Sequence, residues 1–270
     1  MFDPSERCHL CNESKPMTQE HVPPSSAFNK GRWIEADARD ALDLPPGQSP
    51  RGRFRQGGIW LPTLCADCNS FTGREYGDHY RHWAQGCASV LGELADADIQ
   101  SESPKPEIGI RNTNFRRVLK QVGSMFLSVN DLNFRESDIG GELAAFVLLP
   151  AAEGLPEGLR VYTYLNRDGS RRYLPVQPQC DLATGRWRAR SEIAFPPCGW
   201  LMTTDDDLVD ARLLNITGFA SMPDAPGEMD ATIAVLPTHS FIMAGDYRSW
   251  NEVIAPFVEP LAESEEESSV

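Results

Sequence analysis

Four cysteines stand in two Cys-x-x-Cys pairs, Cys8 with Cys11 and Cys65 with Cys68. A two-residue spacer lets both sulfurs of a pair face one ion, and two such pairs supply the four thiolates of a tetrahedral zinc site. A site closed in this way has no open coordination position, so we predict a structural Zn²⁺ and not a reaction centre. Two unrelated cysteine pairs without a metal are the alternative. The surrounding segment has little periodic apolar sequence, so zinc would supply much of its stability.

Further residues able to do chemistry lie between the two cysteine pairs and directly after them. Glu20 and His21 form an acidic-His pair followed by Pro23, and Asn69 comes immediately after Cys68. A neutral histidine is a suitable general base near pH 7, and a hard divalent ion binds carboxylate and amide oxygens. Each residue also has a plain alternative. Glu20 and His21 would then be ordinary surface or buried side chains, and Asn69 would cap a helix.

With these residues, the segment 6–85 resembles the HNH branch of the His-Me finger (ββα-metal) endonucleases, in its zinc-knuckle form. Such domains have an acidic-His pair, a Pro-containing stretch, two zinc knuckles and an Asn or His after the last Cys. The resemblance implies that His21 is the general base, and that Glu20 and Asn69 bind a catalytic Mg²⁺ or Mn²⁺. Because neighbours on a strand point to opposite faces, Glu20 and His21 need a strand end or a bulge to serve one site.

The reaction implied by this resemblance is hydrolysis of phosphodiester bonds, leaving 5′-phosphate and 3′-hydroxyl ends. Nucleic acid would be the partner, with DNA favoured over RNA. Proteins of this build often occur in bacterial restriction and phage defence, which makes antiviral defence the implied setting. Two other functions remain open: a zinc module that binds nucleic acid without cutting it, and a protein-interaction module that zinc merely stabilises.

Three arginines could hold substrate phosphates, namely Arg51, Arg53 and Arg55, and Phe54 between them could stack on a base. A solvated loop explains the same residues equally well. The net charge of −14 argues against indiscriminate binding of nucleic acid over the whole surface. The charge is uneven, however, because residues 1–90 hold ten basic against eleven acidic side chains and the remainder hold 15 against 28. The near-neutral front segment can therefore present a local basic strip.

Hydrophobic spacing predicts the helices that would position these residues. The front segment predicts short strands and loops. From Asn69 apolar residues recur at helical spacing to about Asp96, although Gly73 and Gly77 weaken this helix. Residues 115–127 predict an amphipathic helix against a core. Its basic residues, Arg116, Arg117 and Lys120, could touch phosphate, but a solvated helix face is the commoner explanation and the one expected here.

The patterns become strand-like after about Glu142, with strands predicted at 145–149, 160–165 and 231–236. The predicted fold class is therefore α+β, with an N-terminal ββα-metal, zinc-stapled nuclease module followed by a β-rich α+β domain. The expected boundaries are a nuclease domain with a Cys₄ zinc site at 1–95, a linker at 96–112, an α+β domain of unknown role at 113–258 and an acidic disordered tail at 259–270.

The bulk composition is that of a globular protein, with 41% hydrophobic and 24% charged residues. No apolar run approaches the ~18–20 residues that a membrane span needs. The first residues lack the basic start and apolar stretch of a signal peptide. We therefore expect a cytoplasmic protein without a membrane partner, in which reduced thiols favour metal over disulfides. The acidic segment 113–258 is better suited to binding a protein partner or to inhibiting the protein's own activity than to forming a second DNA-binding surface.

Overall fold

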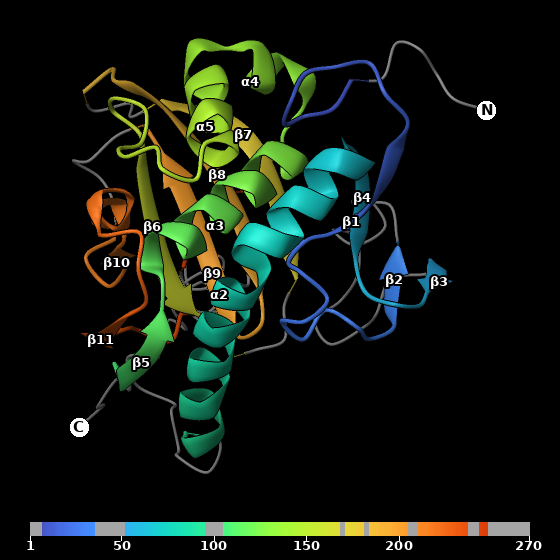
Figure 1. Ribbon diagram of the computed structural model, residues 1–270. Coiled ribbons are helices and arrows are strands. Elements are labelled where there is room, and N and C mark those ends of the chain that lie inside the picture. Colours follow the sequence, from blue (N-terminus) through green and yellow to red (C-terminus); the bar gives the residue numbers. More distant parts are fainter. Residues whose placement is uncertain are drawn as a thin grey trace, which may run out of the picture.

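The computed structural model describes residues 7–35, 52–94, 105–167, 171–180, 184–204, 210–236 and 243–247. Helices and small, mainly antiparallel sheets make up a mixed architecture that fits the expected α+β class (Figure 1). Arg51 and the expected tail at 259–270 lie outside the described residues. The division into a nuclease domain and a second domain stays a prediction.

Two short antiparallel ladders form the N-terminal part. Strand β1 (Met17–His21) pairs with β4 (Trp60–Cys65), and β2 (Trp33–Glu35) pairs with β3 (Arg53–Arg55). Helix α2 (Ala66–Glu93) follows β4 without an intervening loop. The strand and the helix therefore share one rigid corner, which is where the second cysteine pair lies.

Helix α2 begins three residues before the predicted start at Asn69, and its N-cap is Cys65. Asn69 therefore lies inside the helix, and the alternative that it caps the helix is wrong. The predicted helix itself is confirmed, since it runs to Glu93 despite its internal glycines.

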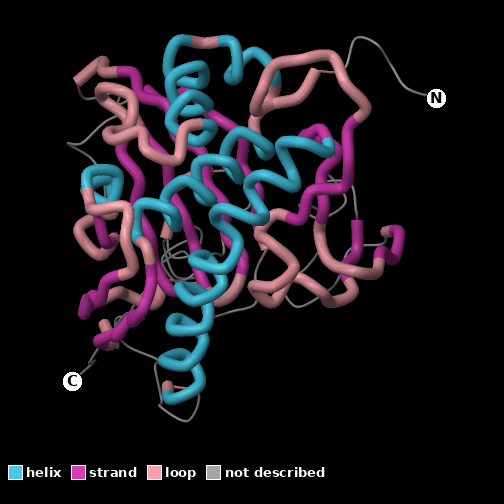
Figure 2. The backbone as a smooth tube through the Cα atoms, viewed as in Figure 1, coloured by secondary structure: helices cyan, strands magenta, loops and turns pink. Residues whose placement is uncertain are grey.

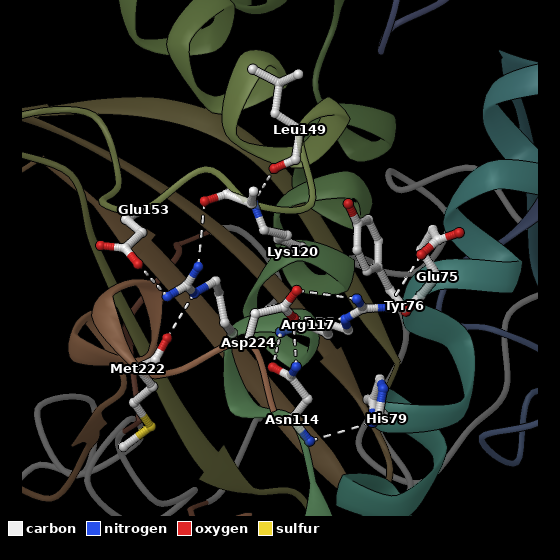
Figure 3. Close-up of polar contacts among 12 residues, drawn as sticks. Glu75, Tyr76, His79, Asn114, Arg117, Lys120, Leu149, Glu153, Met222 and Asp224 are labelled. Carbon is white, nitrogen blue, oxygen red and sulfur yellow. Dashed lines mark hydrogen bonds and ion pairs between the residues drawn. The ribbon is translucent and has the colours of Figure 1, made fainter. Parts of the chain in front are cut away.

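Helix α3 (Phe115–Val129) confirms the second predicted helix, but its basic residues do not form a solvated face. Arg116 is 3% exposed and Lys120 is fully buried. Lys120 donates one hydrogen bond to the carbonyl oxygen of Phe146. It donates another to the carbonyl oxygen of Leu149 at 2.9 Å (Figure 3). The expectation fails because other elements surround α3, so the cations meet carbonyls and acids in place of water.

The strand predicted at 145–149 is wrong, because these residues end a helix. After the short α4 (Leu132–Glu136), helix α5 spans Asp138–Leu148 and is capped by Ser137, whose hydroxyl accepts from Gly140 N. A short apolar run suits a buried helix as well as a strand, and only its packing against α3 decides between them.

The largest sheet has five antiparallel strands in the order β10-β6-β9-β8-β7. The strands are β6 (Arg160–Leu165), β7 (Arg172–Cys180), β8 (Trp187–Phe195), β9 (Cys198–Thr203) and β10 (Leu214–Asn215). Strand β6 confirms the prediction at 160–165.

A separate antiparallel pair joins β5 (Glu107–Thr113) to β11 (Gly227–Thr232). Part of the range expected to be a linker is therefore a strand. The strand expected at 231–236 exists only in part, because β11 ends at Thr232 and Val235 makes an isolated bridge with Leu165. The 3₁₀ helix η1 (Thr217–Ser221) precedes β11.

Helices α2 and α3 lie across one face of the five-stranded sheet (Figures 1 and 2). Trp83 of α2 packs against Trp200 of β9 with ring centroids 5.8 Å apart, and Trp200 Nε1 donates to the Tyr80 hydroxyl at 3.0 Å. One hydrophobic cluster of buried side chains reaches from Cys8 to Val235. The helix that carries Asn69 is thus anchored by the sheet. Within the described part of the chain, no helix combines the length and the apolar character that crossing a membrane requires.

Candidate metal centre and active site

The four cysteines of the two Cys-x-x-Cys pairs come together in the structure. The sulfurs of Cys8, Cys11, Cys65 and Cys68 all lie within 4.8 Å of one another. A tetrahedral zinc with Zn–S bonds of about 2.3 Å needs sulfurs roughly 3.8 Å apart. The sulfurs would need to move together by only about 1 Å to reach this spacing, so these four thiols could hold a zinc ion.

Local structure brings each pair into position. The first pair lies in a tight turn in which Asn12 N donates to Cys8 O at 2.8 Å. The second pair brackets the start of α2, where the partial positive charge of the helix N-terminus favours thiolates. Hydrogen bonds from Cys68 and from the backbone amide of Cys65 lower the pKa of Cys8. The same hydrogen bond raises the pKa of Cys68, and burial raises the pKa of Cys11, so in the absence of a metal Cys8 is the sulfur of the three that this environment deprotonates most readily.

Helices from later in the chain hold the first cysteine pair. Arg135 of α4 donates from Nε and Nη2 to the carbonyl oxygen of Leu10, at 3.1 and 3.0 Å. His9 Nδ1 lies 3.1 Å from Leu127 O, and because a carbonyl only accepts, the ring nitrogen is the donor. His9 therefore faces α3, and the four ligand candidates are all cysteines.

Glu20, His21 and Asn69 line one cavity of about 220 Å³. Pairing of β1 with β4 shifts register between Thr18 and Glu20, and His21 is the last residue of β1. The irregularity and the strand end together allow two neighbours in sequence to face the same cavity. The remaining lining residues are Pro24, Ser25, Ser26, Thr72, Gly73, Gly77, Asp78 and Gln121.

The imidazole of His21 is oriented by a backbone carbonyl. Its Nε2 lies 2.8 Å from the carbonyl oxygen of Gly57. Since the carbonyl can only accept, Nε2 carries the proton, and Nδ1 of the neutral ring is left as the basic nitrogen. This arrangement is compatible with the general-base role expected from the sequence.

Asn29 fixes the segment that carries this carbonyl, and our sequence reasoning did not identify it. The Asn29 side chain is 1% exposed, and its Nδ2 donates to Pro23 O at 2.7 Å and Ile59 O at 2.8 Å. Its Oδ1 accepts from Ile59 N at 2.7 Å. Gly58, at φ +90°, leaves no room for a Cβ, which would lie 2.2 Å from Asn29 O. The Gly57-Gly58 pair, which lies beside the strand of Glu20 and His21, was the available signal in the sequence.

Glu20 is 3% exposed and is held by helix α3. Ser128 donates a hydrogen bond to Glu20 Oε2, while no described group makes a hydrogen bond to Oε1. The hydroxyls of Thr63 and Ser124 are near enough to act on Glu20, but neither has hydrogen-bond geometry. Burial raises the pKa of Glu20 to about 8. An oxygen that is buried without a donor fits a cation, which would also favour the charged carboxylate.

Asn69 is oriented by strand β1. Its Nδ2 donates to Thr18 Oγ1 at 3.0 Å and to the carbonyl oxygen of Gln19 at 3.1 Å. Both amide hydrogens are therefore used, and Oδ1 is the atom available to a ligand. An amide oxygen and a carboxylate oxygen in one cavity suit a hard divalent cation.

The structure describes two of the three arginines expected to contact substrate. Arg53 is exposed on β3 and Arg55 is half-buried. Phe54 between them is 73% exposed, the largest value among the exposed large hydrophobic side chains of the described residues. Strand β3 ends two residues before Gly57, whose carbonyl contacts His21. The exposed Arg53 and Phe54 therefore lie on the same short segment as that carbonyl.

Comparisons of the chain with protein-family models, with curated proteins and with solved structures find no significant match.

Proposed function

We propose that this protein is a metal-dependent endonuclease of the HNH type that hydrolyses phosphodiester bonds, with DNA favoured over RNA as the substrate. The observation that carries the proposal is the hydrogen bond from His21 Nε2 to Gly57 O, in a cavity that Glu20 and Asn69 also line. Hydrolysis of a phosphodiester needs an activated water and neutralisation of the leaving oxygen. The residues around this cavity can meet both needs.

In the proposed reaction His21 Nδ1 takes a proton from water as the water attacks phosphorus. The Gly57 carbonyl keeps the ring in the required tautomer. Glu20 Oε1 and Asn69 Oδ1 would hold a Mg²⁺ or Mn²⁺, which when bound would neutralise charge on the leaving oxygen. The four cysteines would hold a structural Zn²⁺ that fixes the start of α2, and with it the direction of Asn69.

Nucleic acid as a partner is supported by the surface around β3. Arg53 offers a cation and Phe54 an exposed ring, which suit a phosphate and a base respectively. If they bind substrate, Arg53→Ala weakens binding and lowers the slope of log K against log salt by about 1. A filter-binding titration over several salt concentrations measures this slope. The setting of restriction or phage defence is part of the proposal and rests on the sequence resemblance alone.

The test of catalysis is cleavage of a supercoiled plasmid with Mg²⁺ or Mn²⁺, comparing wild type with His21→Ala at equal zinc content. We expect nicking or linearisation by the wild type and its loss in the variant. Equal cutting by both proteins would show that His21 is not the base. Binding of DNA with equal affinity by both proteins and cutting by neither would favour a zinc module that binds without catalysis.

A further inference from the structure

Helix α3 carries a row of buried polar side chains that its apolar surroundings do not explain. Gln121, Ser124 and Ser128 follow one another at spacings of three and four residues, so they lie on one face of the helix. Their exposed fractions are 2%, 0% and 3%. Burying such groups costs free energy unless they find partners. This polar row therefore indicates that α3 meets a polar site.

The site that this row meets is the cavity of Glu20. Ser128 donates to Glu20 Oε2, and Gln121, one helical turn before Ser124, lines the same cavity as Glu20 and His21. Neither Glu20 Oε1 nor Gln121 Oε1 has a hydrogen-bond partner among the described residues. Glu20 and Gln121 both line this cavity, and each has a buried oxygen that makes no hydrogen bond among the described residues, which a bound cation would satisfy.

We infer that Gln121 is a protein ligand of the divalent ion, through Oε1, and so completes the metal site from a helix outside the segment that resembles HNH nucleases. The inference rests on the proposed function for the presence of the ion. A carboxylate and amide oxygens select a hard cation such as Mg²⁺ or Mn²⁺. Asp78 also lines the cavity, but its carboxylate is 80% exposed and pairs with Arg81 at 3.2 Å, so it belongs to the rim.

Mn²⁺ affinity of the full-length, zinc-loaded protein tests this inference, with free Mn²⁺ followed by electron paramagnetic resonance. Gln121→Met keeps the side-chain length and removes the oxygen, so we expect its Mn²⁺ affinity to fall by about tenfold or more. Gln121→Glu keeps an oxygen at the same place and adds a charge, and it should bind Mn²⁺ at least as tightly as the wild type. Zinc content and thermal unfolding of each variant report whether the fold is kept.

Equal Mn²⁺ affinity of Gln121→Met and wild type would overturn the inference and indicate that water fills the cavity there. Absence of Mn²⁺ binding by the zinc-loaded wild type would overturn it as well. His21→Ala separates the inference from the proposed function, because this variant should lose plasmid cleavage and keep its affinity for Mn²⁺. If Mn²⁺ affinity depends on Gln121 and the wild type cuts neither DNA nor RNA, the ion site stands and the nuclease proposal fails.

Discussion

His21 Nε2 and the carbonyl oxygen of Gly57 lie 2.8 Å apart, across the gap between strand β1 and the loop that enters β4. The contact fixes which nitrogen of the ring is protonated, and it depends on where the loop sits. Trp33 Nε1 donates to Gly58 O at 2.8 Å, and Val22 N donates to Ile59 O at 3.2 Å. The ring of His21 is therefore positioned by a backbone carbonyl whose loop is held by hydrogen bonds from other residues.

Asn29 makes three of the hydrogen bonds that fix this loop. Replacing Asn29 should therefore disturb the position of the His21 ring without removing the ring itself. Asn29→Ala removes three hydrogen bonds to Pro23 and Ile59 and leaves buried backbone groups unpaired. We expect the free energy of unfolding to fall by about 2–4 kcal/mol. Plasmid cleavage should fall by about tenfold or more in conditions where the variant stays folded. Urea unfolding and cleavage rates measure the two effects.

The control for Asn29 is Asn133→Ala on α4, whose amide makes an exposed hydrogen bond to Asp131 at 3.0 Å. Its stability should change by less than about 0.5 kcal/mol, with cleavage unaffected. Cleavage at the wild-type rate by Asn29→Ala would show that the Gly57 contact does not matter.

The second prediction concerns the glycines of α2 that line the cavity. Glycine lowers the stability of a helix, and its lack of a side chain leaves space in the cavity. Gly73 and Gly77 line the cavity, and a Cβ at either would meet nothing within 4 Å. Gly77→Ala should therefore stabilise the protein by roughly 0.5–1 kcal/mol and slow cleavage, because the methyl group takes space from substrate or water. Thermal unfolding and plasmid cleavage measure these opposite effects.

A matched control exists in the same helix. Gly92 is exposed near the end of α2, has equally open space for a Cβ, and is absent from the cavity lining. Gly92→Ala should stabilise the protein by a similar amount and leave cleavage unchanged. If Gly77→Ala cuts as fast as Gly92→Ala, the cavity of Glu20 and His21 is not the reaction site.

Sequence reasoning succeeded where local signals decide the structure. The spacing within each cysteine pair requires only a tight turn, and the structure brings all four sulfurs together. Helix α3 and strand β6 carry clear periodic patterns, and both form over the predicted residues. Glu20, His21 and Asn69 line one cavity, although no local pattern indicates that a strand and a helix 48 residues apart would meet there.

Long-range packing decided what the sequence did not indicate. Lys120 has the pattern of a solvated lysine, yet it is buried because α5 places carbonyl oxygens over it. Gln121 and Ser128 lie far along the chain from Glu20, and only the packing of α3 brings them to it. Asn29 was not identified because its partners are backbone groups, which carry no sequence signature.

Zinc removal is the third prediction. Cys8, Cys65 and Cys68 belong to the hydrophobic cluster that also contains Leu10 and Leu64, and Cys11 packs against it, so loss of a bound zinc would leave close, unbridged sulfurs in the core. We expect Cys68→Ser to abolish zinc binding and to destabilise the protein by several kcal/mol. Metal analysis and thermal unfolding measure these losses, and a chelator should reproduce the destabilisation in the wild type.

The half-buried Cys180, which is outside the four-cysteine cluster, supplies the control for zinc. Cys180→Ser should keep the same zinc content and nearly the same midpoint of thermal unfolding as the wild type. Zinc that stays at wild-type level in Cys68→Ser would contradict the four-cysteine site.

The fourth prediction concerns Lys120, whose pKa is lowered from 10.5 to about 8 by burial and by the nearby Arg116 and Arg117, against the opposing effect of Asp224. Figure 3 shows Lys120 beside Arg117, which is itself paired with Asp224 at 2.8 Å and with Glu75 at 3.2 Å. Because the folded-state pKa lies below the unfolded one, the unfolded state binds more protons between about pH 8 and 10.5. The contribution of Lys120 to stability therefore rises with pH across this window.

Lys120→Met removes the titrating group and keeps most of the side-chain volume. The stability of wild type minus that of Lys120→Met should therefore increase from pH 7.5 to pH 10, by up to about 3 kcal/mol for a shift of this size. Urea unfolding of both proteins at each pH gives the difference, in which the titration of the cysteines cancels. A difference that stays constant with pH would mean that Lys120 remains charged in the folded protein throughout, held by the carbonyl oxygens of Phe146 and Leu149.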